Sequence, residues 1–172
     1  MKRCLLLILP LLLVGCQSAS NADMSSIRNF LRVNESFCTG GQPSMEQMAK
    51  LKDEGVKVII NLRMPSEHNA AEEEAKAKEL GLKYFHLPVS PASPQPEQVD
   101  EFLKITDDPL NRPAFVHCAG ALRVGALWMI RRVLRDGWSI EKATEEAEKI
   151  GLRGNAGLKE FALKYINEHQ RK

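Results

Sequence analysis

The sequence contains no apolar stretch long enough to cross a membrane. Its longest apolar run, Leu5 to Val14, is about ten residues long and is interrupted by Pro10. A membrane-spanning helix needs roughly 20 apolar residues, whereas a run of this length is typical of a secretory signal peptide. We therefore expect residues 1–15 to direct export and to be removed.

The sequence also has no surplus of charge and no histidine cluster. The formal net charge is +2, and removal of residues 1–15 takes away Lys2 and Arg3, which leaves 22 basic and 22 acidic side chains. A neutral chain without a basic run argues against a nucleic-acid partner. His68 and His86 stand alone in the sequence, so we expect neither a metal site nor a cofactor.

One of the four cysteines, Cys16, stands two residues after the apolar run. The stretch Leu13 to Cys16 reads Leu-Val-Gly-Cys and resembles the bacterial lipobox, whose cysteine is lipidated and becomes the new N-terminus. An ordinary signal peptide with a chance cysteine is the alternative, but the small Gly15 and the polar stretch after Cys16 favour the lipobox. Gln17 after the cysteine, rather than Asp, suggests a lipoprotein of the outer membrane that faces the periplasm.

The remainder of the chain fits one small domain. Residues 16–28 begin with the lipidated cysteine and are otherwise mostly polar and small, as expected of a flexible tether. Residues 29–172, about 145 in number, suit a single domain. We see no internal repeat in them.

Strand and helix patterns alternate along this domain. The predicted strands are a first one ending near Cys38, then 56–62, 82–89 and 114–117, and the predicted helices are 44–55, 67–80, 97–105, 123–135, one from Ser139, and 156–168. This alternation predicts an α/β fold with a mainly parallel sheet and helices on both faces. Ligands of such sheets bind beyond the carboxyl ends of the strands, which is where Cys118 lies.

The strongest chemical signal is the segment from His117 to Arg123, which joins a buried strand to a helix. Successive backbone N–H groups in such a turn, with the positive end of the following helix, form an anion site that also favours a thiolate at Cys118. Arg123 adds a planar, two-pronged donor that suits phosphate oxygens. A thiolate beside a bound phosphoryl group predicts nucleophilic catalysis through a cysteinyl-phosphate.

The chain resembles the protein tyrosine and dual-specificity phosphatases, which carry a His-Cys-x5-Arg loop. Within them it is most similar to a bacterial branch that also occurs fused to β-lactamase-like hydrolases. The blocks that carry this resemblance are Gln42-Pro43-Ser44, Ile60-Asn61-Leu62-Arg63…Glu67, Leu87-Pro88-Val89, and Val116-His117-Cys118…Arg123-Val124-Gly125-Ala126-Leu127-Trp128.

The resemblance implies a hydrolase that acts on a phosphorylated substrate without a metal or cofactor. Cys118 would be the nucleophile, and Arg123 with the loop amides would hold the phosphate. His117, Arg63 and Glu67 would support the loop, the last two as an ion pair at its rim. The expected phosphate-binding loop comprises Ala119, Gly120, Ala121, Leu122 and Arg123.

The chain departs from the phosphatase pattern at several positions. Only four residues separate Cys118 from Arg123, and Leu122 stands where polar residues are usual. The usual acidic residue is missing from residues 90–96, and Glu97, Asp100 and Glu67 are the substitutes that the sequence offers. Val124 replaces the Ser or Thr that often assists the hydrolytic step.

Two other functions are compatible with the same residues. Rhodanese-like sulfurtransferases also have a cysteine loop of about this length, and a domain that has lost its acid could bind an anion or a partner without turnover. A regulatory role also follows if Cys38 and Cys118 lie at one sheet edge. A reversible disulfide between them would then protect the reactive thiolate from oxidation.

Overall fold

A computed structural model describes residues 24–170 and contains one five-stranded sheet in the order β1-β2-β5-β3-β4. The strands are β1 (Leu31–Arg32), β2 (Phe37–Gly40), β3 (Val58–Asn61), β4 (Lys83–His86) and β5 (Ala114–His117). All neighbouring pairs are parallel except β1 and β2. The sheet is therefore mainly parallel, as predicted, and β5 lies at its centre.

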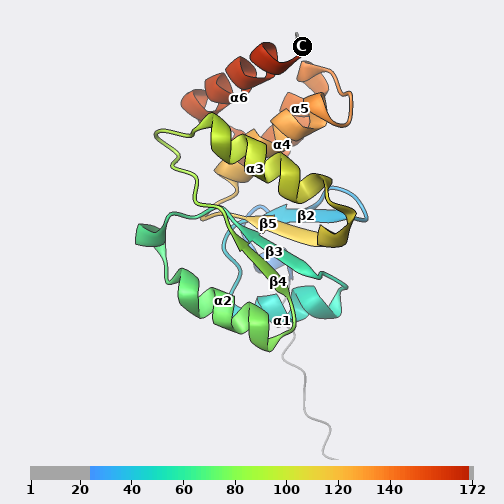
Figure 1. Ribbon diagram of the computed structural model, residues 1–172, viewed down its shortest axis with the longest axis vertical. Coiled ribbons are helices and arrows are strands. Elements are labelled where there is room, and N and C mark those ends of the chain that lie inside the picture. Colours follow the sequence, from blue (N-terminus) through green and yellow to red (C-terminus); the bar gives the residue numbers. More distant parts are fainter. Residues whose placement is uncertain (1–23, 171–172) are drawn as a thin grey trace, which may run out of the picture.

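Helices cover both faces of the sheet (Figure 1). The α-helices are α1 (Met45–Asp53), α2 (Ala70–Glu79), α3 (Pro96–Asp107), α4 (Leu122–Leu134), α5 (Ile140–Ala147) and α6 (Ala156–His169). Short helical segments are η1 (Met24–Ser26), η2 (Pro65–Glu67), η3 (Pro109–Asn111) and the π-helical η4 (Glu148–Leu152). Figure 1 shows α1 and α2 on one face and the other four α-helices on the opposite face.

Local sequence signals explain where several helices begin and end. Ser44 and Gln47 form the predicted capping box at the start of α1. Gly55 follows this helix with φ of +91°, a left-handed conformation that glycine adopts without strain. Asn69, Ser139 and Asn155 cap α2, α5 and α6 through side-chain oxygens.

Two hydrophobic cores lie on the two faces of β5. Val116 faces the larger core, beneath α3, α4, α5 and α6, and Phe115 faces the smaller core, above α1 and α2. Successive side chains of a strand point to opposite faces, so β5 contributes to both cores and is fully buried. This burial places the residue after β5, Cys118, at a rigid position.

The structure corrects two of the predicted boundaries. Ile27, expected in the tether, is buried, and Ser26 accepts a hydrogen bond from Gln47, so the folded part begins by Met24. The helix predicted over 67–80 is divided into η2 and α2 by extended backbone at His68. The signal peptide, Cys16 and the first part of the tether lie outside the described residues. Within residues 24–170, no helix combines the length and apolarity needed to span a bilayer.

Candidate active site

The segment between β5 and α4 forms a closed turn whose carbonyl groups point away from its centre. The carbonyl oxygen of Ala119 accepts a hydrogen bond from the backbone N–H of Gln42 (3.4 Å), and that of Gly120 accepts one from the side chain of Asn29 (3.0 Å). Because a peptide group holds its N–H opposite its carbonyl, the amide of Gly120 points away from Gln42. Gly120 also forms an antiparallel bridge with Gly41, which holds the turn against the end of β2.

The start of α4 adds further free donors to this turn. Ala121 precedes the helix in a left-handed conformation (φ 68°), and no side chain caps the helix. The first N–H groups of an α-helix have no partner within the helix. The amides of Leu122, Arg123 and Val124 are therefore available to an anion, next to the positive end of the helix dipole.

Arg123 is held beside Cys118 by a dense set of contacts. Its guanidinium forms a two-pronged pair with the Glu67 carboxylate (2.6 and 2.8 Å) and also donates to the carbonyls of Leu62 and Val89. Burial alone would lower the pKa of Arg123, but Glu67 and the neighbouring Cys118 outweigh burial and raise it. The buried guanidinium is therefore charged and fixed in orientation.

Glu67 is the partner that orients Arg123. The hydrogen bond from Arg123 is the main cause that lowers the pKa of Glu67 to about 2. Arg63 donates to the backbone carbonyl of Glu67 and to the side chain of Gln42 (2.8 Å). The expected Arg63–Glu67 ion pair is therefore not formed. Arg63 contacts the backbone of Glu67 instead, and the Glu67 carboxylate pairs with Arg123.

Comparison with known proteins identifies the family to which this site belongs. Residues 17–162 match the family model "DSP-PTPase phosphatase fused to NAD+ Kinase". The chain belongs to this family of dual-specificity and tyrosine phosphatase-like proteins. The "Beta-lactamase hydrolase-like protein" of Agrobacterium fabrum is 28% identical over 108 residues, a stretch that covers 60% of this chain and 25% of that relative. The chain thus spans about a quarter of that relative's length.

Solved structures show the same fold. The catalytic domain of the PP-IP phosphatase Siw14 from S. cerevisiae has a TM-score of 0.72 at 23% identity, covering 84% of this chain and 90% of that one. The DUF442 protein of Shewanella putrefaciens has a TM-score of 0.73 at 21% identity, covering 87% and 99%. TpbA of P. aeruginosa has a TM-score of 0.66 at 21% identity, covering 86% and 88%. These likenesses establish the cysteine-phosphatase fold.

In this phosphatase-like domain His117 does not contact the loop through its ring. Its Nε2 lies 2.7 Å from the carboxylate of Glu73 on α2, and both side chains are almost completely buried. Burial would raise the pKa of Glu73, but contact with His117 outweighs burial and lowers it. His117 therefore anchors β5 to α2, on the sheet face opposite Cys118.

Glu73 was not among the residues singled out from the sequence, where it lies in a run of three glutamates. It also accepts hydrogen bonds from Gln42 (2.9 Å) and Asn61 (3.3 Å). The signal that could have identified it is its spacing of four residues from Ala77, because positions i and i+4 share one helix face and Ala77 is buried.

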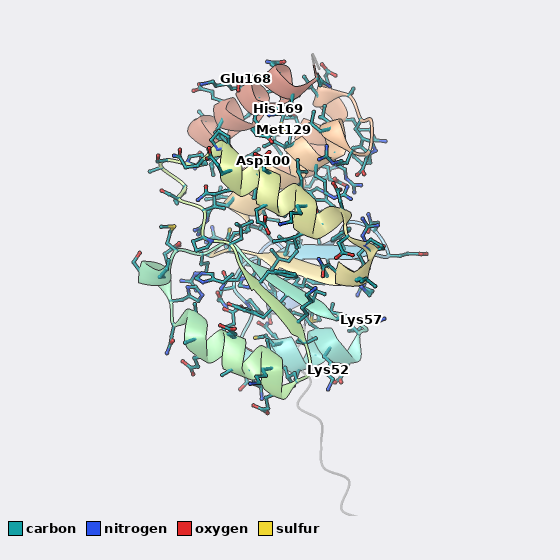
Figure 2. All side chains as sticks on the ribbon, in the orientation of Figure 1. Lys52, Lys57, Asp100, Met129, Glu168 and His169 are labelled. Carbon is teal, nitrogen blue, oxygen red and sulfur yellow. The ribbon has the colours of Figure 1, made fainter. Side chains whose placement is uncertain are left out.

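Two of the three candidate acids are already engaged in other contacts. Glu67 pairs with Arg123, and its lowered pKa leaves no proton to donate near neutral pH. Asp100 accepts a hydrogen bond from Tyr165 on α6, and Figure 2 shows it among the helices farthest from α1 and α2. Glu97 remains, exposed in the first turn of α3.

The structure excludes the expected disulfide between Cys38 and Cys118. Cys38 pairs with Phe115, three residues before Cys118, which places the two cysteines about 10 Å apart along the strands. A disulfide needs Cα atoms within about 7 Å. The two side chains also belong to the two different cores, on opposite faces of the sheet. Both strands are buried, so no mobile loop can bring the sulfurs together.

Proposed function

We propose that this phosphatase-like protein hydrolyses phosphate monoesters through a covalent intermediate on Cys118. The Cys118 thiolate attacks phosphorus, the bond between phosphorus and the ester oxygen breaks, and the leaving oxygen departs as an alkoxide or aryloxide that then takes a proton from water. Water then attacks phosphorus, the phosphorus–sulfur bond breaks, and inorganic phosphate and the thiolate are released.

The observation that carries this proposal is the pairing of Cys118 with a charged, oriented Arg123 beside unpaired loop amides. Guanidinium and amide donors fixed before the substrate arrives stabilise charge on the equatorial phosphate oxygens without reorganisation. Glu67, Leu62 and Val89 occupy Nη1 and one hydrogen of Nη2, which leaves the Nε hydrogen and the second Nη2 hydrogen for a bound phosphate.

The acidic groups available to protonate the leaving oxygen limit which phosphate esters can be hydrolysed quickly. Ser90 follows Val89 where an acid would be expected, and Glu67 and Asp100 are engaged elsewhere. Glu97, the third candidate, is exposed in the first turn of α3, and no contact among the described residues holds it toward the loop. Without a positioned acid, an alcohol of high pKa leaves slowly because it must depart as the alkoxide. Aryl phosphates should therefore be hydrolysed much faster than alkyl phosphates.

A phosphatase assay with purified residues 17–172 under reducing conditions tests this function. Aryl phosphates whose leaving groups span a range of pKa values are compared with alkyl phosphates, and Cys118→Ser serves as the control. The expected result is cysteine-dependent release of phosphate with a steep dependence on leaving-group pKa. Vanadate binding without any turnover would instead favour a non-catalytic anion-binding domain, and a persulfide on Cys118 would favour a sulfurtransferase.

We also propose that the domain acts at a membrane surface in the periplasm, held by lipid on Cys16. This proposal rests on the Leu-Val-Gly-Cys stretch after a short apolar run. The full chain should fractionate with membranes, and Cys16→Ser should be released or remain unprocessed. Recovery of the wild-type protein entirely in the soluble fraction would contradict the anchor.

A further inference from the structure

A hollow of about 450 Å³ adjoins the loop that follows Cys118. Two loop residues, Gly120 and Leu122, form one wall. The opposite walls are Arg28 and Asn29, which precede β1, and the segment that runs from η4 to Arg153. A group bound in the hollow would therefore lie next to a phosphate held by the loop.

The hollow is lined by basic side chains that have no carboxylate partner among the described residues. Arg28, Lys149 and Arg153 line it, against a single acid, Glu148, which pairs with Lys159 (3.2 Å). Nine arginines lie within residues 24–170. Arg28 and Arg153 are the two whose guanidinium groups have no acceptor or carboxylate among the described residues, while the other seven are engaged.

Those seven arginines show how unusual the two free ones are. Each forms an ion pair with a carboxylate or donates a hydrogen bond to an oxygen of another residue: Arg32, Arg63, Arg112, Arg123, Arg131, Arg132 and Arg135. Free arginines thus coincide with the hollow rather than being scattered over the surface. Arginine in such a position is suited to bind phosphate.

The hollow is built against the loop by close contacts. The Arg28 guanidinium lies against Gly120, about 3.4 Å from where a Cβ atom would stand. Asn29, in a left-handed conformation (φ 55°), donates to the Gly120 carbonyl. Gly151 has φ of +145° in the π-helical segment, and a Cβ there would lie 3.1 Å from the Gly120 carbonyl oxygen. The basic walls are therefore fixed relative to the loop.

We infer that this hollow is a second anion subsite, which binds another phosphate group of the same substrate molecule. The inference rests on the proposed function and narrows its substrate class to esters that carry two phosphates. A substrate with one phosphate would occupy the loop alone and leave three cations unpaired. A substrate with a second phosphate would satisfy them at the same time.

Binding to the Cys118→Ser protein tests this inference without relying on turnover. The probes are bisphosphates of straight-chain diols of two to six carbons and alkyl monophosphates of matched length, measured by titration calorimetry at fixed ionic strength. At the best chain length the bisphosphate should bind about tenfold or more tightly than the monophosphate, with one molecule bound per chain. This advantage should decline at shorter and longer spacings.

Charge variants in the Cys118→Ser background locate the effect. Lys149→Glu/Arg153→Glu and the neutral pair Lys149→Ala/Arg153→Ala should each reduce the bisphosphate advantage to about twofold or less. Lys52→Glu/Lys57→Glu makes the same change of charge and should retain the advantage, because Lys57 lies beside Pro113 at the amino end of β5, the sheet edge opposite Cys118. Figure 2 labels both lysines. Thermal unfolding of each variant verifies that it is folded.

Three results would overturn the subsite. These are equal affinity for matched bisphosphates and monophosphates, an advantage that survives in both Lys149/Arg153 pairs, and two bound bisphosphates per chain. Failure of the proposed function is seen separately, as absence of Cys118-dependent hydrolysis of p-nitrophenyl phosphate by the otherwise unchanged protein.

Discussion

Two cysteines, one within β2 and one just after the neighbouring strand β5, occupy different environments. Cys38 lies within β2, where its sulfur contacts the carbonyl oxygen of Ala114 (3.7 Å) and burial raises its pKa to about 12. Cys118 lies beyond the end of β5, beside Arg123 and the uncapped start of α4. Both are almost fully buried, so burial alone does not decide what a thiol can do. The difference lies in the donors that surround each sulfur.

The sharpest way to test this comparison is to remove each sulfur in turn. Cys118→Ser should lower kcat for p-nitrophenyl phosphate by about three orders of magnitude or more, because a serine hydroxyl in this site has no base to activate it. Cys38→Ala should leave kcat within about twofold, since its side chain points to the other core. Steady-state kinetics gives kcat for both variants, and a large loss of kcat in Cys38→Ala would contradict the difference between the two cysteines.

Among the hydrogen-bond donors that surround Cys118, Arg123 is the one that a substitution can test. Arg123→Lys should lower kcat/KM by about a hundredfold, because lysine keeps the charge but lacks the planar fork that meets Glu67 and phosphate together. Arg131→Lys is a matched control, since Arg131 is also buried and paired, but with Asp136. Equal effects in the two variants would mean that general destabilisation, rather than phosphate binding, explains the loss.

A smaller effect concerns pH and the Glu67–Arg123 pair. The folded-state pKa of Glu67 is lowered to about 2, so the pair stabilises the fold above the ordinary carboxyl pKa of 4.5. That stabilisation should be lost as the pH falls from about 4.5 to about 2. Urea unfolding between pH 7 and pH 2 compares wild type with Glu67→Gln. The difference between their free energies of unfolding should shrink toward low pH, and a constant difference would contradict the pair's role.

The smallest expected effect is in redox response. Because Cys38 lies out of reach of Cys118, Cys38→Ala should not change either the rate of inactivation by hydrogen peroxide or the recovery on adding reductant. Protection of the wild type relative to Cys38→Ala would contradict the geometry described above. Non-reducing peptide mapping after oxidation checks the same point directly.

The parts of the fold that could be predicted from the sequence are those with strong local signals. Ala114 to His117 is an apolar run that ends at a Gly-containing turn, and its strand was predicted with the observed bounds. The capping pattern at Ser44 likewise located α1. The chemistry proposed for Cys118 and Arg123 rests on their positions around such a turn.

What could not be predicted depends on contacts between distant segments. Strand β1 is only two residues long and exists because it pairs with β2. Glu73 resembles its exposed neighbours until α2 is packed onto His117. The separation of Cys38 from Cys118 depends on strand register, and a shift of one residue would turn each side chain to the other face. Register is set by packing rather than by local propensity.

The proposed mechanism requires that Cys118 carry the phosphoryl group during turnover. Rapid acid quenching of the enzyme with an aryl phosphate, followed by peptide mass spectrometry, tests it most directly. A phosphoryl adduct is expected on the peptide that contains Cys118, absent in Cys118→Ser and unchanged in Cys38→Ala. Turnover that proceeds with no adduct on Cys118, or with the adduct on another residue, would contradict it.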